Sequence, residues 1–316
     1  MKIIFLSSDK IALLTFYALV RYHKIVAVIT QPDRPKGRSG KLIPSIISVA
    51  AEEQDIQVYK PEKISIELIE KLKKLKADLF VIFGYGVILQ KEFFSVAKMG
   101  GINIHPSLLP ELRGPSPIQA AILQGMKKSG LTIQKIALKM DTGDILYQKP
   151  FDILPDDDEN SIEELASKIA SESIIMLLEK IENKQLKAIP QDDTKATYCK
   201  LIKKEDGLIN WQDNGENVIN KVRAFVKWPV AYTFLDKNRI NIYKIKVNDR
   251  IDFKKYKNVK EGKIIFADKA NGIVVKARDS LLNIELLQQS GKKILDWKNF
   301  LNGYKKSLSG KTFNRE

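Results

Sequence analysis

Short apolar segments alternate with amphipathic segments through the N-terminal part of the chain, and this order restricts the possible folds. Residues 2–6 are predicted to form a strand, residues 10–21 a helix and residues 24–30 (KIVAVIT) a second strand. The alternation continues with a helix over 46–54, a strand over 56–59, a helix over 64–76 and a strand over 77–83. Strands separated by helices are typical of a parallel sheet with helices on both faces. The first domain is therefore predicted to be α/β, with a Rossmann-like, mostly parallel sheet.

A short strand that ends in polar residues is the main candidate for chemistry. Ile102 and Ile104 alternate with Asn103 and His105, and Pro106 must end regular pairing. Residues i and i+2 of a strand share a face, so Asn103 and His105 are expected to project together. An amide N–H and a protonated imidazole N–H aimed at one point can stabilise an oxyanion. From spacing alone, a turn-capping Asn and a structural His remain an equal alternative.

A longer run extends this strand and carries a resemblance to a known family. The run is NIHPSLLPELRGPSPIQAAI, and Asp141-Thr142-Gly143-Asp144 follows downstream. Together these segments resemble the signature of folate-dependent formyltransferases, and the resemblance covers nearly the whole chain. It implies transfer of the formyl group of 10-formyltetrahydrofolate to the α-amino group of methionyl-initiator-tRNA, through a tetrahedral intermediate and without a covalent enzyme intermediate.

The resemblance also implies roles for individual residues. Asn103 and protonated His105 would stabilise the oxyanion, and Asp141 would orient His105 and help to remove the proton of the amine. Read in isolation, an Asp before a glycine turn is more often only a turn former. The residues implied to line the folate pocket are Ser107, Leu108, Leu109, Pro110 and Tyr85. Leu108 and Leu109 are expected to offer an exposed apolar surface to a flat ring, although two core leucines are the alternative.

The first turn of the chain departs from the family pattern. Ser7-Ser8-Asp9 replaces the Gly-Thr-Pro-Glu-Phe-like turn that is usual in these formyltransferases, which affects the expected shape of one edge of the pocket. The same turn lacks the G-x-G-x-x-G fingerprint, so a dinucleotide cofactor gains no support.

Residues 31–44 (QPDRPKGRSGKLIP) contain three prolines and two glycines and are predicted to be an exposed loop. The loop carries the cations Arg34, Lys36, Arg38 and Lys41. A solvated connector is one interpretation, and a finger that contacts phosphate is the other. The resemblance favours contact with tRNA and singles out Arg38.

The charge of the chain is concentrated towards its C-terminus. The formal net charge of the 316 residues is +15, and residues 201–316 hold 25 Lys and Arg against 13 Asp and Glu, a net of +12. A basic part beside a near-neutral part suggests a polyanionic partner, although a lysine-rich surface can also reflect A·T-rich coding or solubility.

The periodicity changes to successive short strands in the same region. They are predicted over 232–235, 239–247, 262–267, 272–276 and 281–288. Strands without intervening helices indicate a small barrel or sandwich, and the resemblance implies an OB-like barrel. We therefore predict a catalytic domain over 1–188, a linker over 189–205 and a basic, OB-like tRNA-binding domain over 206–316.

Composition excludes several other classes. Cys199 is the single cysteine, and His23 is the only histidine besides His105. Neither a disulfide framework nor a metal site is therefore expected. No apolar run approaches the ~20 residues of a membrane span, and the N-terminus lacks the order of a signal peptide, so a cytoplasmic protein is expected. A monomer is also expected, although the sequence does not determine the oligomeric state. Two alternatives remain open for function: formyl transfer to a small amine, such as a sugar nucleotide or glycinamide ribonucleotide, and non-catalytic RNA binding.

Overall fold

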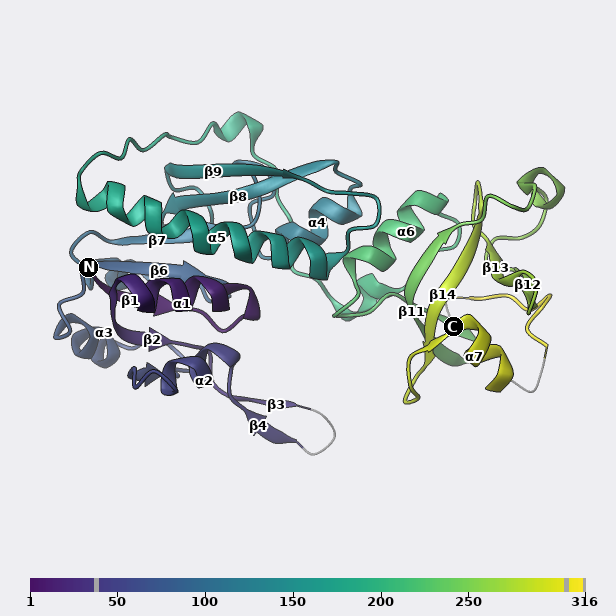
Figure 1. Cartoon of the computed structure of the whole chain (residues 1–316), viewed down its shortest axis with the longest axis horizontal. Helices are drawn as coiled ribbons and strands as arrows, with labels where there is room; N and C mark the ends of the chain where they lie inside the picture. Colours follow the sequence, from purple (N-terminus) through teal and green to yellow (C-terminus); the bar gives the residue numbers. More distant parts are fainter. Residues whose placement is uncertain (37–39, 304–306, 315–316) are drawn as a thin grey trace. The chain divides into compact units, whose positions relative to one another are not determined.

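The computed structural model describes residues 1–36, 40–303 and 307–314 of the chain (Figure 1). These residues form two compact units. Unit 1 comprises residues 1–117, 128–152 and 162–200, and unit 2 comprises residues 118–127, 153–161 and 201–316 within the described ranges. Among the described residues, no helix combines the length and the apolar character that crossing a membrane requires.

Unit 1 is built on a seven-stranded sheet in the order β5-β2-β1-β6-β7-β8-β9. Its strands are β1 (Lys2–Leu6), β2 (Lys24–Ile29), β5 (Val58–Tyr59), β6 (Leu79–Phe83), β7 (Gly101–His105), β8 (Lys128–Lys135) and β9 (Ile145–Asp152). The five strands from β5 to β7 run parallel, and β8 and β9 are antiparallel to their neighbours. The predicted mostly parallel α/β sheet is therefore confirmed.

Helices cover both faces of this sheet because both faces of its strands are apolar. Phe5 of β1 contacts Phe16 of α1 (Leu13–Tyr22), with ring centroids 5.8 Å apart. Ile4, also of β1, belongs to a buried cluster with Leu68 and Leu72 of α3 (Ile66–Lys73). Neighbouring residues of a strand point to opposite faces, so α1 and α3 lie on opposite sides of the sheet.

The remaining helices complete the layers. They are α2 (Ile46–Glu52), α5 (Glu159–Glu182) and the short 3-10 helices Lys10–Ala12, Lys91–Ser95 and Asp193–Lys195. Helix α4 (Pro117–Leu123) belongs to unit 2 except for its first residue. Figure 1 shows α1 and α5 lying across the sheet of unit 1. The helices predicted before residue 83 all form, although α3 is shorter than its pattern suggested.

The carboxyl ends of the parallel strands meet at one edge of the sheet, where open α/β sheets form their crevices. Ser8, after β1, donates its backbone N–H to the carbonyl of Gly84, after β6, at 3.2 Å. Gln31, after β2, donates from its side chain to the carbonyl of Tyr85 at 2.8 Å. The unusual first turn of the chain thus lies at the edge where β7 also ends.

Residues 31–44 contain a hairpin rather than the irregular loop that was predicted. Strand β3 (Arg34–Lys36) pairs antiparallel with β4 (Lys41–Ile43). The segment is exposed as predicted, since Leu42 and Ile43 of β4 lie at the surface. Strands β3 and β4 form a separate two-stranded sheet outside the seven-stranded one. The prolines and glycines of this segment indicated a loop, but proline is tolerated in a strand at the edge of a sheet.

Unit 2 is a curled antiparallel sheet in the order β10-β11-β14-β13-β12. Its elements are α6 (Gly215–Ala224), β10 (Tyr232–Leu235), β11 (Asn238–Val247), β12 (Ile264–Asp268), β13 (Gly272–Lys276), β14 (Leu281–Gln289), β15 (Leu295–Asp296), α7 (Trp297–Gly303) and the 3-10 helices Lys204–Gly207 and Phe253–Tyr256. The five main strands were predicted, whereas β15 and α7 were not.

The C-terminal segment joins the two edges of this curled sheet. Asn314 exchanges backbone hydrogen bonds with Phe234 of β10, and Thr312 bridges Lys263 beside β12. Closure removes the open sheet edges that would otherwise leave backbone groups unpaired. The predicted OB-like domain is confirmed at this level, as a small antiparallel half-barrel.

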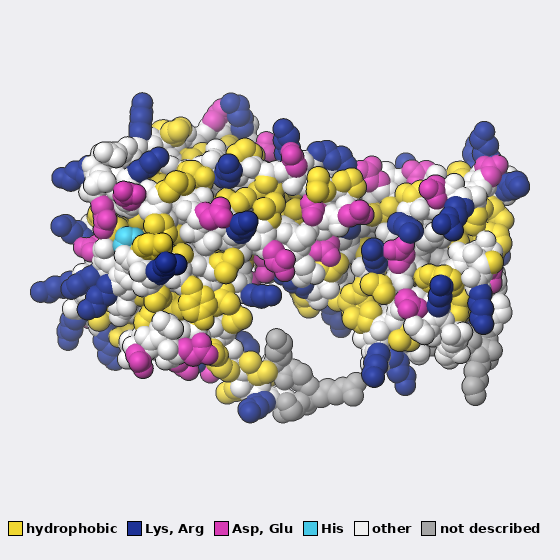
Figure 2. Space-filling view, in the orientation of Figure 1, with side chains coloured by type: hydrophobic (Ala, Val, Ile, Leu, Met, Phe, Trp, Pro, Cys, Tyr) yellow, Lys and Arg dark blue, Asp and Glu magenta, His cyan; other side chains and the backbone are white. Residues whose placement is uncertain are grey.

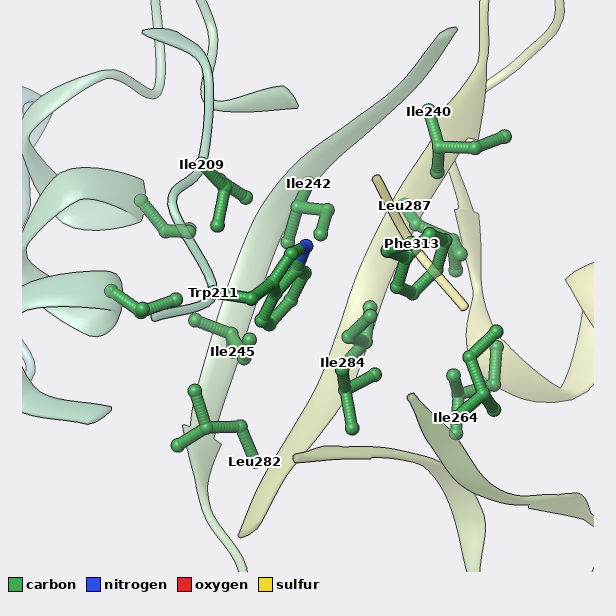
Figure 3. Packing of buried hydrophobic residues seen from close by; sticks show 14 of the residues in the cluster. Ile209, Trp211, Ile240, Ile242, Ile245, Ile264, Leu282, Ile284, Leu287 and Phe313 are labelled. Carbon is green, nitrogen blue, oxygen red and sulfur yellow. The ribbon is translucent and has the colours of Figure 1, made fainter. Parts of the chain in front are cut away.

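The core of unit 2 is organised around a buried tryptophan. Trp211 stacks on Phe313, with ring centroids 5.6 Å apart, and donates its indole N–H to Thr233 at 3.0 Å. Figure 3 shows Trp211, Ile242 and Ile284 converging between the strands. A tryptophan can be buried in this way because its one polar atom has a partner.

Candidate active site

Strand β7 places Asn103 and His105 on one face at its carboxyl end. The strand lies between β6, which is parallel, and β8, which is antiparallel, so both of its edges are paired. Ile102 and Ile104 point into the apolar layers and are buried. The alternation of the sequence is therefore the alternation of a real strand, and the two polar side chains project together as predicted.

Asp141 approaches both of these residues from the turn after β8. Its Oδ1 accepts a hydrogen bond from Asn103 Nδ2 at 3.2 Å, and its Oδ2 lies 3.7 Å from His105 Nδ1. The side chains of His105 and Asp141 are only 6% and 9% exposed. The structure thus brings together all three residues that were predicted to be catalytic.

The turn that delivers Asp141 depends on a glycine and on a left-handed residue. Asp141 itself has φ +55°, a conformation that Asp tolerates better than most side chains. At Gly143, a Cβ atom would lie 1.7 Å from the carbonyl oxygen of Lys135, so that only glycine fits against this strand. The glycine of the DTG sequence is therefore required by close packing on β8.

The carboxylate of Asp141 has two further donors besides Asn103. Gly114 N–H donates to Oδ2 at 2.9 Å, and Gln134 Nε2 donates to Oδ1 at 2.9 Å. An ionised carboxylate offers about four acceptor sites and no donor. Three are occupied by these bonds, which leaves one for the imidazole of His105, for a water molecule or for a substrate.

The imidazole of His105 is oriented by a backbone carbonyl. Its Nε2 lies 3.0 Å from the oxygen of Leu112. A carbonyl only accepts, so Nε2 carries hydrogen and Nδ1 faces Asp141 and the site. The nitrogen available for chemistry is therefore Nδ1.

Residues 191–200, which lie within the predicted linker, pack against the loop after β7. Arg113 forms a parallel bridge with Tyr198, and its N–H donates to Thr197 O at 2.9 Å. Cys199 N–H donates to Arg113 O at 2.8 Å. A Cβ atom at Gly114, where φ is +122°, would lie 2.5 Å from the carbonyl oxygen of Cys199. Residues 189–200 thus cluster with unit 1, and residues 201–205 with unit 2.

Three side chains of this site were missed by the sequence reasoning: Arg113, Gln134 and Gln191. Arg113 is 1% exposed, and its guanidinium contacts Gln191, which reaches the backbone of Asp141. Arg113 lies inside the recognised run, and that was the only available signal. Gln191 stands in a polar stretch with few apolar residues, which by itself is typical of a linker.

The turn from 107 to 110 is more buried than predicted. Leu109 is 2% exposed, and its backbone is held by Thr132 Oγ1 at 3.0 Å and by Gln148 Nε2 at 2.7 Å. Ser107 is also buried and donates to Glu111 O at 2.7 Å. The expectation that Leu109 exposes an apolar surface is wrong, because its backbone bonds turn the side chain into the core.

Two neighbours of Leu109 in this turn are partly accessible. Leu108 is half-buried and packs where Gly130 has no side chain, and Pro110 is also half-buried. The carbonyl of Pro110 accepts from Thr197 N at 3.2 Å, so the connecting segment also fixes this end of the turn.

Tyr85 belongs to the core of unit 1. It is 3% exposed, and burial raises the pKa of its hydroxyl to about 12. The residues that follow it are different, since Val87 and Ile88 are 43% and 75% exposed. The exposed apolar surface at this edge therefore comes from Val87 and Ile88, beyond the end of β6.

The cations predicted to contact tRNA are only partly described. Arg34 is exposed, with its guanidinium 3.8 Å from Glu62, and Lys41 is exposed on β4. Lys36 lies on β3, but its side chain and all of Arg38 fall outside the described residues. Figure 2 shows Lys and Arg side chains distributed over the visible face of the molecule. In the described ranges, no three His, Cys, Asp or Glu side chains gather as a metal site would require.

Two family matches together account for most of the chain. Residues 1–179 match the formyl transferase family, and residues 201–305 match the formyl transferase C-terminal domain. The chain belongs to the formyl transferase family.

Relatives at 36–40% identity are methionyl-tRNA formyltransferases. Over 99% of its length the chain is 39% identical to methionyl-tRNA formyltransferase from Borreliella afzelii, of which it covers 98%. It is 36% identical to methionyl-tRNA formyltransferase from Treponema denticola, with 98% of this chain and 99% of the relative covered.

Solved structures share the fold at low identity. An N-formyltransferase from Helicobacter canadensis, in complex with folinic acid and dTDP-3-aminofucose, has a TM-score of 0.67 at 20% identity, over 92% of this chain and 99% of that one. Methionyl-tRNA formyltransferase from Clostridium thermocellum has a TM-score of 0.55 at 19% identity, over 79% and 95%. HypX from Aquifex aeolicus, in complex with tetrahydrofolic acid, has a TM-score of 0.64 at 18% identity, and the chain spans 51% of its length and 99% of its own.

Proposed function

We propose that this chain transfers the formyl group of 10-formyltetrahydrofolate to the α-amino group of methionyl-initiator-tRNA. The observation that carries the proposal is the cluster of Asn103, His105 and Asp141 in a chain that is 39% identical, over its full length, to a methionyl-tRNA formyltransferase. Translation initiation takes place in the cytoplasm, and the proposal places the chain there.

The reaction needs a site for negative charge and an acceptor for one proton. The amine nitrogen attacks the formyl carbon, and the carbonyl oxygen becomes an oxyanion. Collapse of the tetrahedral intermediate breaks the bond to N10 of the folate, which takes up a proton as it leaves. The amine loses one proton, so atoms and charge balance without an enzyme-bound intermediate.

The geometry suggests one group for each task. Asn103 uses one N–H on Asp141 and has a second for the oxyanion, and Nδ1–H of protonated His105 can donate to the same oxygen. Asp141 has one free acceptor site for the proton of the amine, directly or through water.

We place the folate at the carboxyl edge of the sheet, beyond β6 and β7. Val87 and Ile88 provide exposed apolar surface there, and Leu108 and Pro110 are partly accessible beside the catalytic cluster. An apolar wall with few polar groups suits a flat pteridine ring. Ser107, Leu109 and Tyr85 would shape this pocket from behind, because their side chains are buried.

We infer that tRNA contacts the hairpin and the basic C-terminal region. The proposed contacts in the hairpin are Arg34, Lys36, Arg38 and Lys41, and residues 201–316 hold the net charge of +12. A polyanion is attracted by such a region without any need for base recognition. The predicted domains are a catalytic domain over 1–188, a linker over 189–205 and a tRNA-binding domain over 206–316. Because residues 189–200 cluster with unit 1, we propose that the catalytic domain extends to residue 200.

A formyl-transfer assay with purified chain and 10-formyltetrahydrofolate tests this function. The acceptors are methionyl-initiator-tRNA, methionyl-elongator-tRNA, an amino-sugar nucleotide and glycinamide ribonucleotide. Efficient transfer to methionyl-initiator-tRNA alone is expected. Faster transfer to a small amine would replace the proposal, and binding of tRNA without transfer to any acceptor would leave only an RNA-binding protein.

A further inference from the structure

Arg113 is a buried cation whose side chain points towards Gln191. Its Nε and Nη2 donate to Gln191 Oε1 at 3.1 and 2.7 Å. Nη2 also donates to Asp193 at 2.7 Å, and Nη1 reaches the hydroxyl of Tyr198 at 3.4 Å. Burying a guanidinium is costly unless its donors are satisfied, so these bonds account for its position.

Gln191 connects Arg113 to the turn that carries Asp141. Its Nε2 donates to the backbone carbonyls of Asp141 at 2.9 Å and Gly143 at 2.7 Å, and lies 3.2 Å from Gln134 Oε1. Gln134 is buried, and its Nε2 donates to Asp141 Oδ1 at 2.9 Å. The two hydrogens of Gln191 Nε2 are shared among these three acceptors, and through the shared contact with Gln134 a series of hydrogen bonds runs from Arg113 to the carboxylate of Asp141.

The bond directions in this series are all consistent with its first member, and backbone groups of the turn favour the same directions. A guanidinium has donors and no acceptor, so Gln191 must turn its oxygen towards Arg113. The amide NH2 of Gln191 then faces the oxygen of Gln134, and the NH2 of Gln134 faces Asp141. Gly143 N–H, at 3.2 Å from Gln134 Oε1, enforces the same orientation.

We propose, on the basis of the formyl transfer proposed above, that Arg113 and Gln191 are positioning residues that keep a donor of Gln134 on the carboxylate of Asp141. A reversed amide at Gln134 would set its oxygen against an ionised oxygen and push Asp141 away from His105. Arg113 and Gln191 need not touch either substrate. Their effect should appear in kcat, because it concerns the charge and placement of Asp141 during the reaction.

Kinetics of four variants test the proposal. Gln191→Glu keeps an oxygen for Arg113 but turns a second oxygen towards the three acceptors of Gln191 Nε2. Arg113→Met removes the cation that orients the amide of Gln191. Each should lower kcat by about tenfold, the effect of one lost charge-assisted bond, with KM for both substrates within about twofold. The kcat of Arg113→Lys should lie between those of these two variants and that of the wild type.

Asp193→Ala is the matched control, because it removes an exposed partner of Arg113 that lies outside the series. It should keep kcat within about twofold of the wild type. A loss in Asp193→Ala equal to that of Arg113→Met, or a change in KM alone in Gln191→Glu, would overturn the proposal.

A double-mutant cycle separates action through Gln134 from simple support of the turn. Gln134→Leu removes the amide while keeping most of the volume. If Gln191 acts through Gln134, the loss caused by Gln191→Glu should be several times smaller in the Gln134→Leu background. An equal loss in both backgrounds would show that Gln191 only holds the backbone of the turn.

A readout without turnover keeps this test separate from the proposed function. In protein labelled with 15N at glutamine, the side-chain NH2 signals of Gln134 and Gln191 should exchange slowly with water. Exchange should become several-fold faster in Arg113→Met and stay unchanged in Asp193→Ala. If the wild type failed to formylate methionyl-tRNA, the proposed function would be rejected. The exchange rates would still test whether Arg113 orders the side chains of Gln191 and Gln134. Unchanged exchange in Arg113→Met would overturn the inference.

Discussion

Cys199 Sγ and His105 Nε2 share one acceptor, the backbone carbonyl of Leu112, at 3.7 and 3.0 Å. The thiol comes from the segment predicted to be a linker, and the imidazole comes from the central strand. The segment that follows the last helix of unit 1 is therefore part of the candidate active site. The single cysteine of the chain can report on the charge there.

The first prediction concerns the titration of Cys199. Burial raises the pKa of its thiol, the N–H of Ser116 opposes this shift, and the charge of Asp141 adds to it. A raised pKa means less thiolate at pH 8, so alkylation by iodoacetamide should increase with pH only above the range of a free thiol. Mass spectrometry across pH values, with urea-unfolded chain as control, gives the midpoint.

The same experiment on Asp141→Asn tests the proximity of the two groups. Removal of the carboxylate charge should lower the pKa of Cys199, and thus move the midpoint towards that of the unfolded chain. An unchanged midpoint would mean that the charge of Asp141 does not reach the thiol.

The second prediction concerns the two proposed oxyanion donors. Asn103→Ala and His105→Ala should each lower kcat by ~10² or more while leaving tRNA affinity nearly unchanged, because both act on charge formed only in the transition state. Single-turnover kinetics and filter binding measure the two effects. His23→Ala provides the matched control, since its ring contacts the N-terminal amine. Near-normal turnover in both variants would remove these residues from the mechanism.

The third prediction concerns the turn that carries Asp141. Gly143→Ala places a methyl group 1.7 Å from Lys135 O, so the turn must move. We expect a loss of about 1–3 kcal/mol in the free energy of unfolding and a lower kcat. Gly303 lies at the end of α7, and a Cβ atom there would meet no described atom within 4 Å outside its chain neighbours and its own helix, so Gly303→Ala should instead be neutral or slightly stabilising. Urea unfolding compares them, and equal stability of both variants would contradict the close packing.

The fourth prediction separates specific tRNA contact from surface charge. Arg38→Ala should lower kcat/KM for methionyl-tRNA by more than tenfold, about 1.4 kcal/mol, if the hairpin positions the acceptor end. Lys74→Ala removes one exposed cation beside α3 and should have little effect. Measurement at several salt concentrations is needed, because one phosphate contact changes the slope of log affinity against log salt by about 0.7–0.9. Equal kinetics for both variants would favour a small-amine acceptor.

Local pattern in the sequence was sufficient for the elements that hold the site. The alternation of Ile102 and Ile104 with Asn103 and His105 predicted β7 and the shared face of its polar residues, and both are confirmed. The apolar run of residues 77–83 likewise predicted β6, which the structure begins at Leu79. Periodicity is a local property of the chain, and it can therefore be recognised in the sequence without a structure. The resemblance added Asp141, which spacing alone treated as a turn former.

The residues that complete the site from distant parts of the chain can be identified only from the fold. Gln191 meets Arg113 across 78 positions of sequence, and no local pattern encodes such a contact. Leu109 looked available to a ligand, but bonds from Thr132 and Gln148 turn it inward. Periodicity, charge and motif are local properties of the chain, so the sequence alone predicted most of the strands, the basic C-terminal region and the catalytic candidates. Burial and hydrogen-bond direction around Asp141 arise only when separate segments pack together, and the structure alone decided them.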